Sequence, residues 1–152
     1  MSYAWNQRLQ KTKRRTLFLE RSLCMEKEQK FFICEHCGNL IGMIDASGVP
    51  MVCCGSKMKE LVANTSDGAT EKHVPVCEVK DGKVYVEVGS VAHPMTPEHY
   101  IQWVYLKTNQ GGQRKVLEPG QEPKVAFALT EDEVALEVYE YCNLHGLWKT
   151  EL

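Results

Sequence analysis

Much of the chain after residue 73 alternates between apolar and polar residues, which is the pattern of β-strands with one buried face. Residues 74–80 and 83–88 lie on either side of Asp81-Gly82. An Asp-Gly pair favours a two-residue type I′ turn, because both central residues of that turn need a positive φ. The sequence therefore predicts a β-hairpin that contains both segments.

The alternation returns in residues 100–106, where Ile101, Trp103 and Tyr105 are expected to share one face of a strand. Gly111-Gly112 is expected to turn the chain after this strand. Two later segments alternate in the same way, namely residues 124–129 and 134–139. Because no long helix is indicated, short strands at this spacing predict an all-β domain, an antiparallel sandwich of about seven strands.

A second pattern occupies residues 30–61, where short apolar runs alternate with cysteine-containing turns. Residues 31–33 and 40–44 are expected to be strands. A unit of about 30 residues buries too little apolar surface to be stable alone, and a structural metal can supply on the order of 10 kcal/mol. A polar segment, residues 64–70, follows it. We therefore predict three regions: an N-terminal extension (1–24), a small metal module (25–62) and a β-sandwich (63–152).

Residues 1–24 contain several basic side chains and lack the apolar segment of a signal peptide. We expect this extension to be disordered or helical, without a part in function. Over the whole chain, the net charge of −2 argues against nucleic-acid binding and against a polybasic membrane contact. No apolar run approaches the roughly 20 residues of a membrane span. We therefore expect neither nucleic acid nor a membrane as a partner.

Seven cysteines are many for 152 residues, and their odd number argues against a secreted disulfide framework. In a reducing, cytoplasmic setting, clustered thiols more often bind metal than form disulfides. Cys34 and Cys37 form a Cys-x-x-Cys turn, and Cys53 and Cys54 can supply two further thiolates. A disulfide between adjacent cysteines would be strained. Four thiolates suit zinc and a single iron equally well, so the residues leave this metal open.

A second group of candidate ligands is scattered through the β-rich part, at expected strand ends or in loops, where binding residues concentrate. It consists of His73, His93, His99, Cys142 and His145. A copper electron-transfer site uses two histidines, a cysteine and a weak axial methionine, but no methionine follows His145 and two histidines would be left over. Four imidazoles with an axial thiolate would instead fill five positions around iron and leave the sixth open. The residues alone leave both metals open.

In their order and spacing, these motifs resemble desulfoferrodoxin, the two-iron superoxide reductase family. The resemblance covers about residues 30–150 and rests on four stretches: the cysteines at 34, 37, 53 and 54, then residues 71–75, 93–101 and 142–148. It implies a desulforedoxin-like N-terminal module that holds iron in four thiolates, followed by an immunoglobulin-like sandwich with a second iron. In the second site it implies four equatorial histidines, with Cys142 on the axis.

The resemblance also implies a function, the reduction of superoxide to hydrogen peroxide without release of oxygen. It implies a homodimer that takes electrons from a rubredoxin-type donor. Lys72 would attract the anion, and Glu71 would occupy the sixth position of the ferric metal and help to displace product. Cys77 matches no ligand position and is expected to be buried and inert. The alternative is an electron-transfer protein of cupredoxin or rubredoxin type that does not turn over superoxide.

Overall fold

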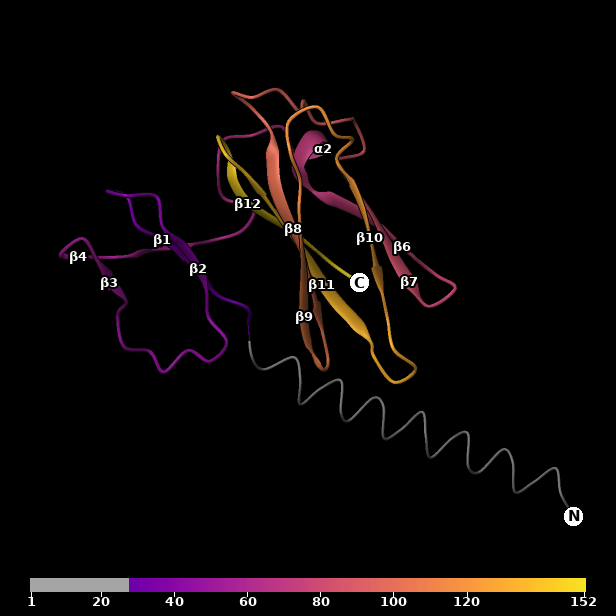
Figure 1. The fold of residues 1–152 in the computed structure, drawn as a ribbon, viewed down its shortest axis with the longest axis horizontal. Coiled ribbons are helices and arrows are strands. Elements are labelled where there is room, and N and C mark those ends of the chain that lie inside the picture. The colour runs from indigo at the N-terminus through magenta and orange to yellow at the C-terminus, as the bar shows by residue number, and fades with distance from the viewer. Residues whose placement is uncertain (1–27) are drawn as a thin grey trace, which may run out of the picture.

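Residues 28–152 are described in the computed structural model, and the extension expected over residues 1–24 lies outside this part of the chain. The described residues form a small β-structured unit and a larger β-sandwich, which lie beside each other in Figure 1. The helix among them, α2 (Thr70–His73), is a single turn. The expected all-β fold, with a small cysteine-containing module before an antiparallel sandwich, is confirmed.

Seven strands form the sandwich: β6 (Pro75–Lys80), β7 (Lys83–Val88), β8 (Ile101–Thr108), β9 (Gly111–Val116), β10 (Lys124–Ala128), β11 (Ala135–Cys142) and β12 (Gly146–Glu151). One antiparallel sheet has the order β10-β7-β6, and the other has the order β12-β11-β8-β9. The prediction of an immunoglobulin-like sandwich with about seven strands is confirmed.

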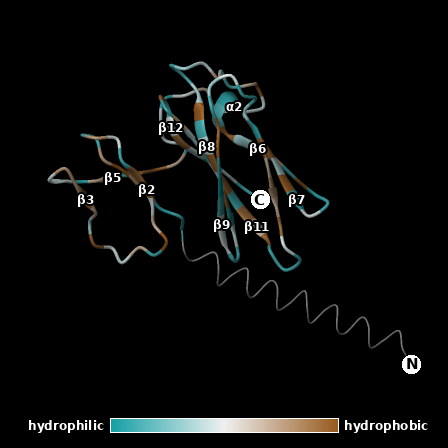
Figure 2. Ribbon diagram, in the orientation of Figure 1, coloured by the Kyte–Doolittle hydropathy of each residue, from teal (hydrophilic) through white to brown (hydrophobic). Residues whose placement is uncertain are grey.

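The two sheets enclose a core of branched side chains. Val84, Val86 and Val88 point inward from β7 and are at most 2% exposed. They belong to the same cluster as Val104 and Leu106 of β8, which are fully buried. Figure 2 shows apolar and polar positions alternating along strands of the sandwich. Burial of each such side chain contributes about 1.5–3 kcal/mol, so the core is a rigid base for the loops at its ends.

The expected β-hairpin is present. β6 and β7 pair antiparallel along their whole length. Asp81 and Gly82 connect them with φ values of 50° and 68°, the positive values that a type I′ turn needs. The turn lies at the far end of this hairpin from α2 (Figure 1).

β8 is less regular than its sequence indicates. Its pairing with β11 skips Gln102, which makes this residue the extra one in a β-bulge. The bulge places Ile101 in the core between the sheets, whereas Trp103 and Tyr105 lie on the opposite face of β8. The expectation that all three apolar residues share one face is therefore wrong for Ile101.

The turn after β8 also differs from the expectation. Asn109 and Gln110 make the turn, and Gly111 and Gly112 already belong to β9. Gly112 is required for packing and not for the turn, because the hydroxyl group of Tyr105 lies where a Cβ atom on residue 112 would be. The absence of a side chain at this position thus permits close packing between two strands.

Five short strands form the small unit: β1 (Phe31–Ile33), β2 (Leu40–Gly42), β3 (Val52–Cys53), β4 (Ser56–Lys57) and β5 (Lys59–Leu61). β1 lies between β2 and β5, and β3 pairs with β4 in a separate ladder. The second strand ends two residues before the end of the expected range, residues 40–44. The domain limits at 25–62 and 63–152 stay a prediction.

An aromatic cluster attaches the small unit to the sandwich. Phe31 of β1 is 4% exposed, and its ring centroid lies 5.1 Å from that of Trp103. Tyr105 and Tyr139 flank the same ring at 5.5 and 5.4 Å. Trp103 in turn stacks on Tyr141, with ring centroids 5.5 Å apart. The sandwich therefore supplies apolar surface that the small unit cannot provide for itself.

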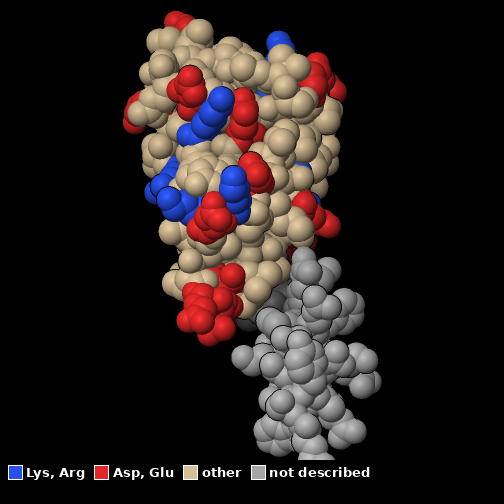
Figure 3. All heavy atoms as spheres, turned by 90° about the vertical axis from the view of Figure 1, so that its right-hand side faces the viewer, with Lys and Arg blue, Asp and Glu red and all other residues tan. Residues whose placement is uncertain are grey.

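The surface of the sandwich carries charges of both signs. Figure 3 shows basic and acidic side chains interspersed on the side that faces right in Figure 1. Lys124 of β10, for example, lies 3.3 Å from Glu87 and 3.8 Å from Glu122. Among residues 28–152, no helix has the length and apolar character needed to cross a membrane. Charges of opposite sign therefore lie close together on this face.

Candidate metal centres

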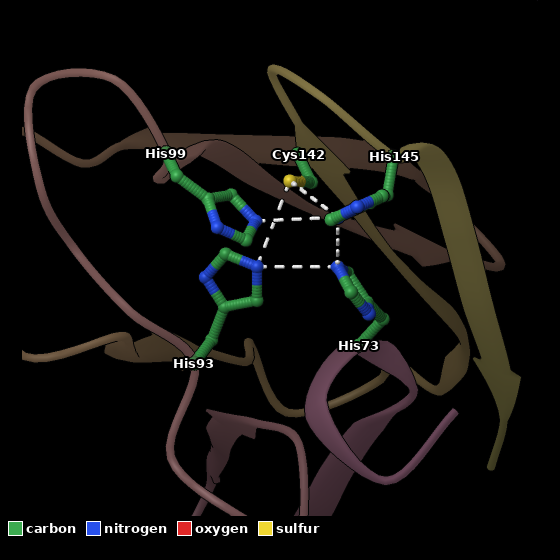
Figure 4. Close-up of side chains that lie close together, drawn as sticks. All are labelled: His73, His93, His99, Cys142 and His145. Atoms are coloured by element: carbon green, nitrogen blue, oxygen red, sulfur yellow. Dashed lines mark hydrogen bonds between the residues drawn. The ribbon is translucent and has the colours of Figure 1, made fainter. Parts of the chain in front are cut away.

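Five candidate ligands gather at one end of the sandwich, although they come from separate parts of the sequence. His73 ends α2, and His93 and His99 lie in the loop between β7 and β8. Cys142 ends β11, and His145 lies in the turn to β12. Figure 4 shows all five side chains pointing toward one centre, and their ligand atoms all lie within 4.8 Å of one another.

The four imidazoles form a square. His73 Nε2 lies 3.1 Å from His93 Nε2 and 3.0 Å from His145 Nδ1. His99 Nε2 lies 3.2 Å from His145 Nδ1. Neighbouring rings have centroids 4.6–4.8 Å apart, whereas His73 and His99 are 6.5 Å apart. The longer distance is the diagonal of the square, so His73 lies opposite His99, and His93 lies opposite His145.

The sulfur of Cys142 lies on the axis of this square. Cys142 Sγ is 3.6 Å from His93 Nε2 and 3.6 Å from His145 Nδ1. These two nitrogens occupy opposite corners. The points in the plane of the square that lie equally far from both are taken up by His73 and His99, so the sulfur lies above or below the square. Five donors in this arrangement form a square pyramid, and the position opposite the sulfur is free of protein ligands within the described residues.

The spacing of the donors matches a bound metal ion. With metal–nitrogen bonds of about 2.1 Å, two nitrogens at a right angle are about 3.0 Å apart. The three nitrogen separations of 3.0–3.2 Å along the sides of the square agree with this value. The geometry therefore fits a metal at the centre of the four imidazoles.

The hydrogen bonds of two rings lead to the same conclusion. His73 Nδ1 lies 2.8 Å from the carbonyl oxygen of Ala69, and His93 Nδ1 lies 2.6 Å from that of Pro94. Each Nδ1–H donates to its carbonyl, which leaves a lone pair on Nε2. These two Nε2 atoms lie 3.1 Å apart, where two acceptors repel each other unless both bind the same cation. Imidazoles with one thiolate suit iron with an open position better than four-coordinate zinc.

Burial favours the neutral form of His93 and His73, the form that metal binding requires. It lowers the pKa of His93 from 6.5 to about 4, against the hydrogen bond to Pro94, which raises it. Burial also lowers the pKa of His73. Both rings are therefore ready to accept a metal at neutral pH.

The metal-free protein is expected to lose stability as the pH falls from about 6.5 to 4. Over this range the unfolded chain binds a proton at His93 that the folded chain does not bind, so protonation favours unfolding. The shift corresponds to a loss on the order of 3 kcal/mol by pH 4. Urea unfolding of the chelator-treated protein at pH 7, 5.5 and 4 measures this loss. A His93→Gln variant should show a flatter pH dependence, and equal slopes would contradict the assignment.

The surroundings of Cys142 shift the pKa of its thiol in opposite directions. Burial raises its pKa, whereas the backbone N–H groups of His145 and Leu144 donate to the sulfur and lower it. Hydrogen bonds of this kind to a ligand sulfur adjust how strongly the thiolate donates electron density to a metal. A bound cation would add its own attraction and hold the sulfur in the thiolate form.

Trp148 and Ser66, to which the sequence analysis assigned no role, help to hold the ligands in place. Trp148 stacks on His73, with ring centroids 4.9 Å apart, and its Nε1–H donates to the carbonyl of His145 at 3.2 Å. Ser66 Oγ donates to the same carbonyl. A Cβ atom on Gly68 would lie 2.8 Å from the Trp148 ring and 3.2 Å from His73. The polar segment of residues 64–70 therefore packs against the site, and a glycine was the sequence signal for this contact.

Glu71 and Lys72 lie in α2 beside the histidine square. Glu71 is exposed, and its carbonyl accepts a hydrogen bond from the backbone N–H of Val91 at 2.9 Å. Burial and the charges of His145 and then Lys72 lower the pKa of His99. Since His99 lies across the square from His73, the positive charge of Lys72 acts on both sides of the site.

Glu140 is a further residue that sequence analysis missed. Its side chain is fully buried, and neither carboxylate oxygen has a hydrogen-bond partner among the described residues. Burial raises its pKa well above 4.5, and its charge, when present, raises the pKa of Cys142. A glutamate at an inward position of an alternating strand was the signal that could have revealed it.

The four cysteines of the small unit form a second candidate centre. Cys37 Sγ lies 3.6 Å from Cys53 Sγ, which lies 4.0 Å from Cys54 Sγ. Sulfurs at the corners of a tetrahedron with bonds of about 2.3 Å are about 3.8 Å apart. The described cysteines are free thiols, and Cys34 completes the group. Backbone N–H groups of Cys37 and His36 lower the pKa of Cys34 to about 6, so one thiolate forms readily.

Comparison with known proteins adds to this geometry. Residues 65–151 match the profile of the desulfoferrodoxin family. The chain is 45% identical over 127 residues to desulfoferrodoxin from Nitratidesulfovibrio vulgaris, which covers 84% of this chain and 99% of that protein. It is 44% identical over 126 residues to a desulfoferrodoxin homologue from Archaeoglobus fulgidus, covering 83% of this chain and 99% of the relative.

A solved structure agrees with these relatives. The superoxide reductase from Treponema pallidum superposes with a TM-score of 0.70 at 48% sequence identity, covering 82% of this chain and 100% of that one. A match over 82% of this chain is longer than the sandwich alone, so it extends into the small unit. By its sequence, its fold and its two groups of ligands, the chain belongs to the desulfoferrodoxin family.

Proposed function

We propose that the chain is a superoxide reductase that carries two mononuclear iron centres. The observation that carries this proposal is the square of four imidazoles with one axial sulfur, which spares a single position for a small ligand. A relative of this chain is itself named superoxide reductase. The ligands proposed for the catalytic iron are His73, His93, His99, Cys142 and His145. Those proposed for the second iron are Cys34, Cys37, Cys53 and Cys54.

The reaction consumes one superoxide, one electron and two protons, and yields hydrogen peroxide. Iron, when bound, supplies the electron to superoxide at the open position. The four histidines hold that position in a fixed place, and the Cys142 thiolate increases the electron density of the centre. The backbone N–H groups of His145 and Leu144 limit this donation by attracting charge on the sulfur. Protons come from solvent, since His99 and its loop are partly exposed.

Lys72 is proposed to draw superoxide to the site, and Glu71 would bind the iron in its ferric state and help to release the product. The support for Lys72 is that its charge acts on His73 and on His99. A cation beside a small opening raises the local concentration of an anion.

Lys72→Ala is expected to slow superoxide consumption roughly three- to tenfold at low salt, with a smaller effect at high salt where the charge is screened. Iron content and visible absorption should not change, because Lys72 is not a ligand. The rate constant is measured by pulse radiolysis at several ionic strengths. Lys83→Ala removes an equal charge at the far end of the β6–β7 hairpin and should match the wild type. An unchanged rate in Lys72→Ala would remove this residue from the mechanism.

The proposal extends to the setting of the enzyme: a cytoplasmic homodimer that receives electrons from a rubredoxin-type donor. The small unit exposes Ile44, Val49 and Val52 at 102%, 72% and 63%, which supports burial against a second copy. Sedimentation analysis tests the dimer, and reduction of the ferric protein by rubredoxin tests the donor.

Metal analysis with absorption spectra tests the function as a whole. About two irons per chain, thiolate-to-Fe(III) charge-transfer absorption and superoxide consumption without oxygen release are expected. An iron protein with these spectra that does not consume superoxide would instead be an electron carrier. A colourless zinc protein would contradict both functions.

A further inference from the structure

His99 differs from two other histidines of the square in what holds its ring. The Nδ1 atoms of His73 and His93 donate to backbone carbonyls. Among the described residues, the ring nitrogens of His99 have a hydrogen-bond contact only with His145, which is itself a candidate ligand. His99 is also half-buried, whereas His73 and His93 are buried. The place of the His99 ring therefore depends on the backbone of its loop.

The side chain of Asn143 holds that loop on both sides of His99. Its Oδ1 accepts a hydrogen bond from the backbone N–H of Tyr100 at 2.9 Å. Its Nδ2 donates to the carbonyl of Glu98 at 2.8 Å. The backbone N–H of Asn143 adds a third bond, to the carbonyl of Tyr100 at 3.2 Å. One residue next to Cys142 thus ties down the two neighbours of His99.

We propose that Asn143 is the positioning residue for His99, which it fixes against the turn that carries Cys142. This inference rests on the proposed iron site. Only an amide side chain carries an NH2 donor and a carbonyl acceptor next to each other on one planar group. Aspartate could still accept from Tyr100, but it would turn a second acceptor toward the carbonyl of Glu98. Loss of the amide leaves the position of His99 to a loop held by fewer bonds, which weakens one corner of the square.

The chain offers a matched control in Asn109. Its Oδ1 accepts from the backbone N–H of Val134 at 2.7 Å, and its Nδ2 donates to the carbonyl of Asp132 at 3.2 Å. The side chain therefore makes the same two kinds of bond between two segments. It lies after the last residue of β8, while the loop of His99 precedes the first, so the eight residues of this strand separate the two sites. Substituting either asparagine by alanine should reduce the stability of the fold by a similar amount. Only the substitution of Asn143 should also cause loss of iron from the histidine site.

The test follows iron loss to a chelator in Asn143→Ala, Asn143→Asp and Asn109→Ala. The charge-transfer absorption of each centre is recorded separately, so the four-cysteine iron is an internal reference in every sample. Asn143→Ala is expected to lose iron from the histidine site about 10–100-fold faster than the wild type, as is typical for outer partners of metal ligands. The rate of iron loss from Asn143→Asp should lie between the rates of Asn143→Ala and the wild type. Asn109→Ala should lose iron at the wild-type rate.

Two results would overturn the inference. One is an Asn143→Ala protein that keeps its iron as long as Asn109→Ala does. The other is an Asn143→Ala protein that loses iron from both centres equally. If the alanine variant does not fold, Asn143→Asp carries the same comparison, because it keeps the size of the side chain. Failure of the proposed function is seen separately, as a wild-type protein without iron in the histidine site.

Discussion

Cys142→Ala is expected to reduce superoxide consumption by more than about 100-fold, beyond the range typical for loss of an outer partner of a metal ligand. Cys142 is fully buried and supplies the only sulfur of the histidine site within the described residues. Without it, four imidazoles would still be available to hold a metal, but the thiolate that would increase its electron density is lost. The charge-transfer absorption of this centre should disappear, while that of the four-cysteine centre persists. Steady-state kinetics, spectra and metal analysis on the same sample measure these changes.

Cys77→Ala is the control for this experiment. Like Cys142, Cys77 packs against the core, although its thiol is only partly buried, and it belongs to neither group of ligands. Burial raises its pKa to about 11, so it stays a neutral thiol near pH 7. The variant is expected to retain both absorptions and the wild-type rate. A Cys142→Ala protein with undiminished turnover would exclude an axial thiolate from the mechanism.

Phe31→Ala is expected to destabilise the small unit by about 3–5 kcal/mol, the usual effect of removing a buried aromatic ring. Phe31 contacts Trp103, Tyr105 and Tyr139, so its loss removes the main apolar contact between the small unit and the sandwich. The four-cysteine iron should then be released at a lower urea concentration. The histidine site should be released at nearly the wild-type concentration, since its ligands come from the sandwich alone.

Phe127→Ala supplies the reverse comparison. Phe127 is fully buried between the sheets of the sandwich, away from the aromatic cluster of β1. This variant is expected to release iron from the histidine site at a lower urea concentration than the wild type. If Phe31→Ala instead lowered the midpoints of both centres equally, the two units would unfold as one, and the separation at residues 62 and 63 would have no energetic meaning.

The strands of the sandwich were largely predictable because burial on one face imposes a period of two. The hairpin at Asp81-Gly82 shows this best, since the turn chemistry and the flanking strands indicate the same structure. β9 and β12 were not predicted. β9 is mostly exposed and polar, and β12 follows directly on the turn that carries His145, so neither has a clear alternation.

The bulge at Gln102 illustrates what a period cannot show. A strand pattern assigns faces on the assumption of unbroken pairing, and one extra residue reverses the assignment on one side of it. The faces of Trp103 and Tyr105 were correctly grouped, whereas Ile101 moved to the other face. Only the pairing with β11 determines this, and that partner is distant in the sequence.

The candidate ligands could be named from the sequence, but their geometry could not. Cys142 and His145 are close in sequence, whereas His73, His93 and His99 meet them only through the packing of the two sheets. The residues that support the ligands were less visible still. Asn143 and Trp148 lay inside a motif without an assigned task, and Glu140 carried no motif at all. Their contribution depends on contacts with backbone or on burial, which single residues in a sequence do not reveal.

The wide separation of the ligands along the chain has a consequence for durability. An ion held by His73 and His145 joins residues 72 positions apart, and so acts as a reversible cross-link across most of the sandwich. Closing so long a loop removes conformational freedom from the unfolded ensemble, by an amount that grows slowly with loop length. Iron uptake would therefore lengthen the lifetime of the whole sandwich, and an oxidant that expels the ion would shorten the survival of the protein together with its activity.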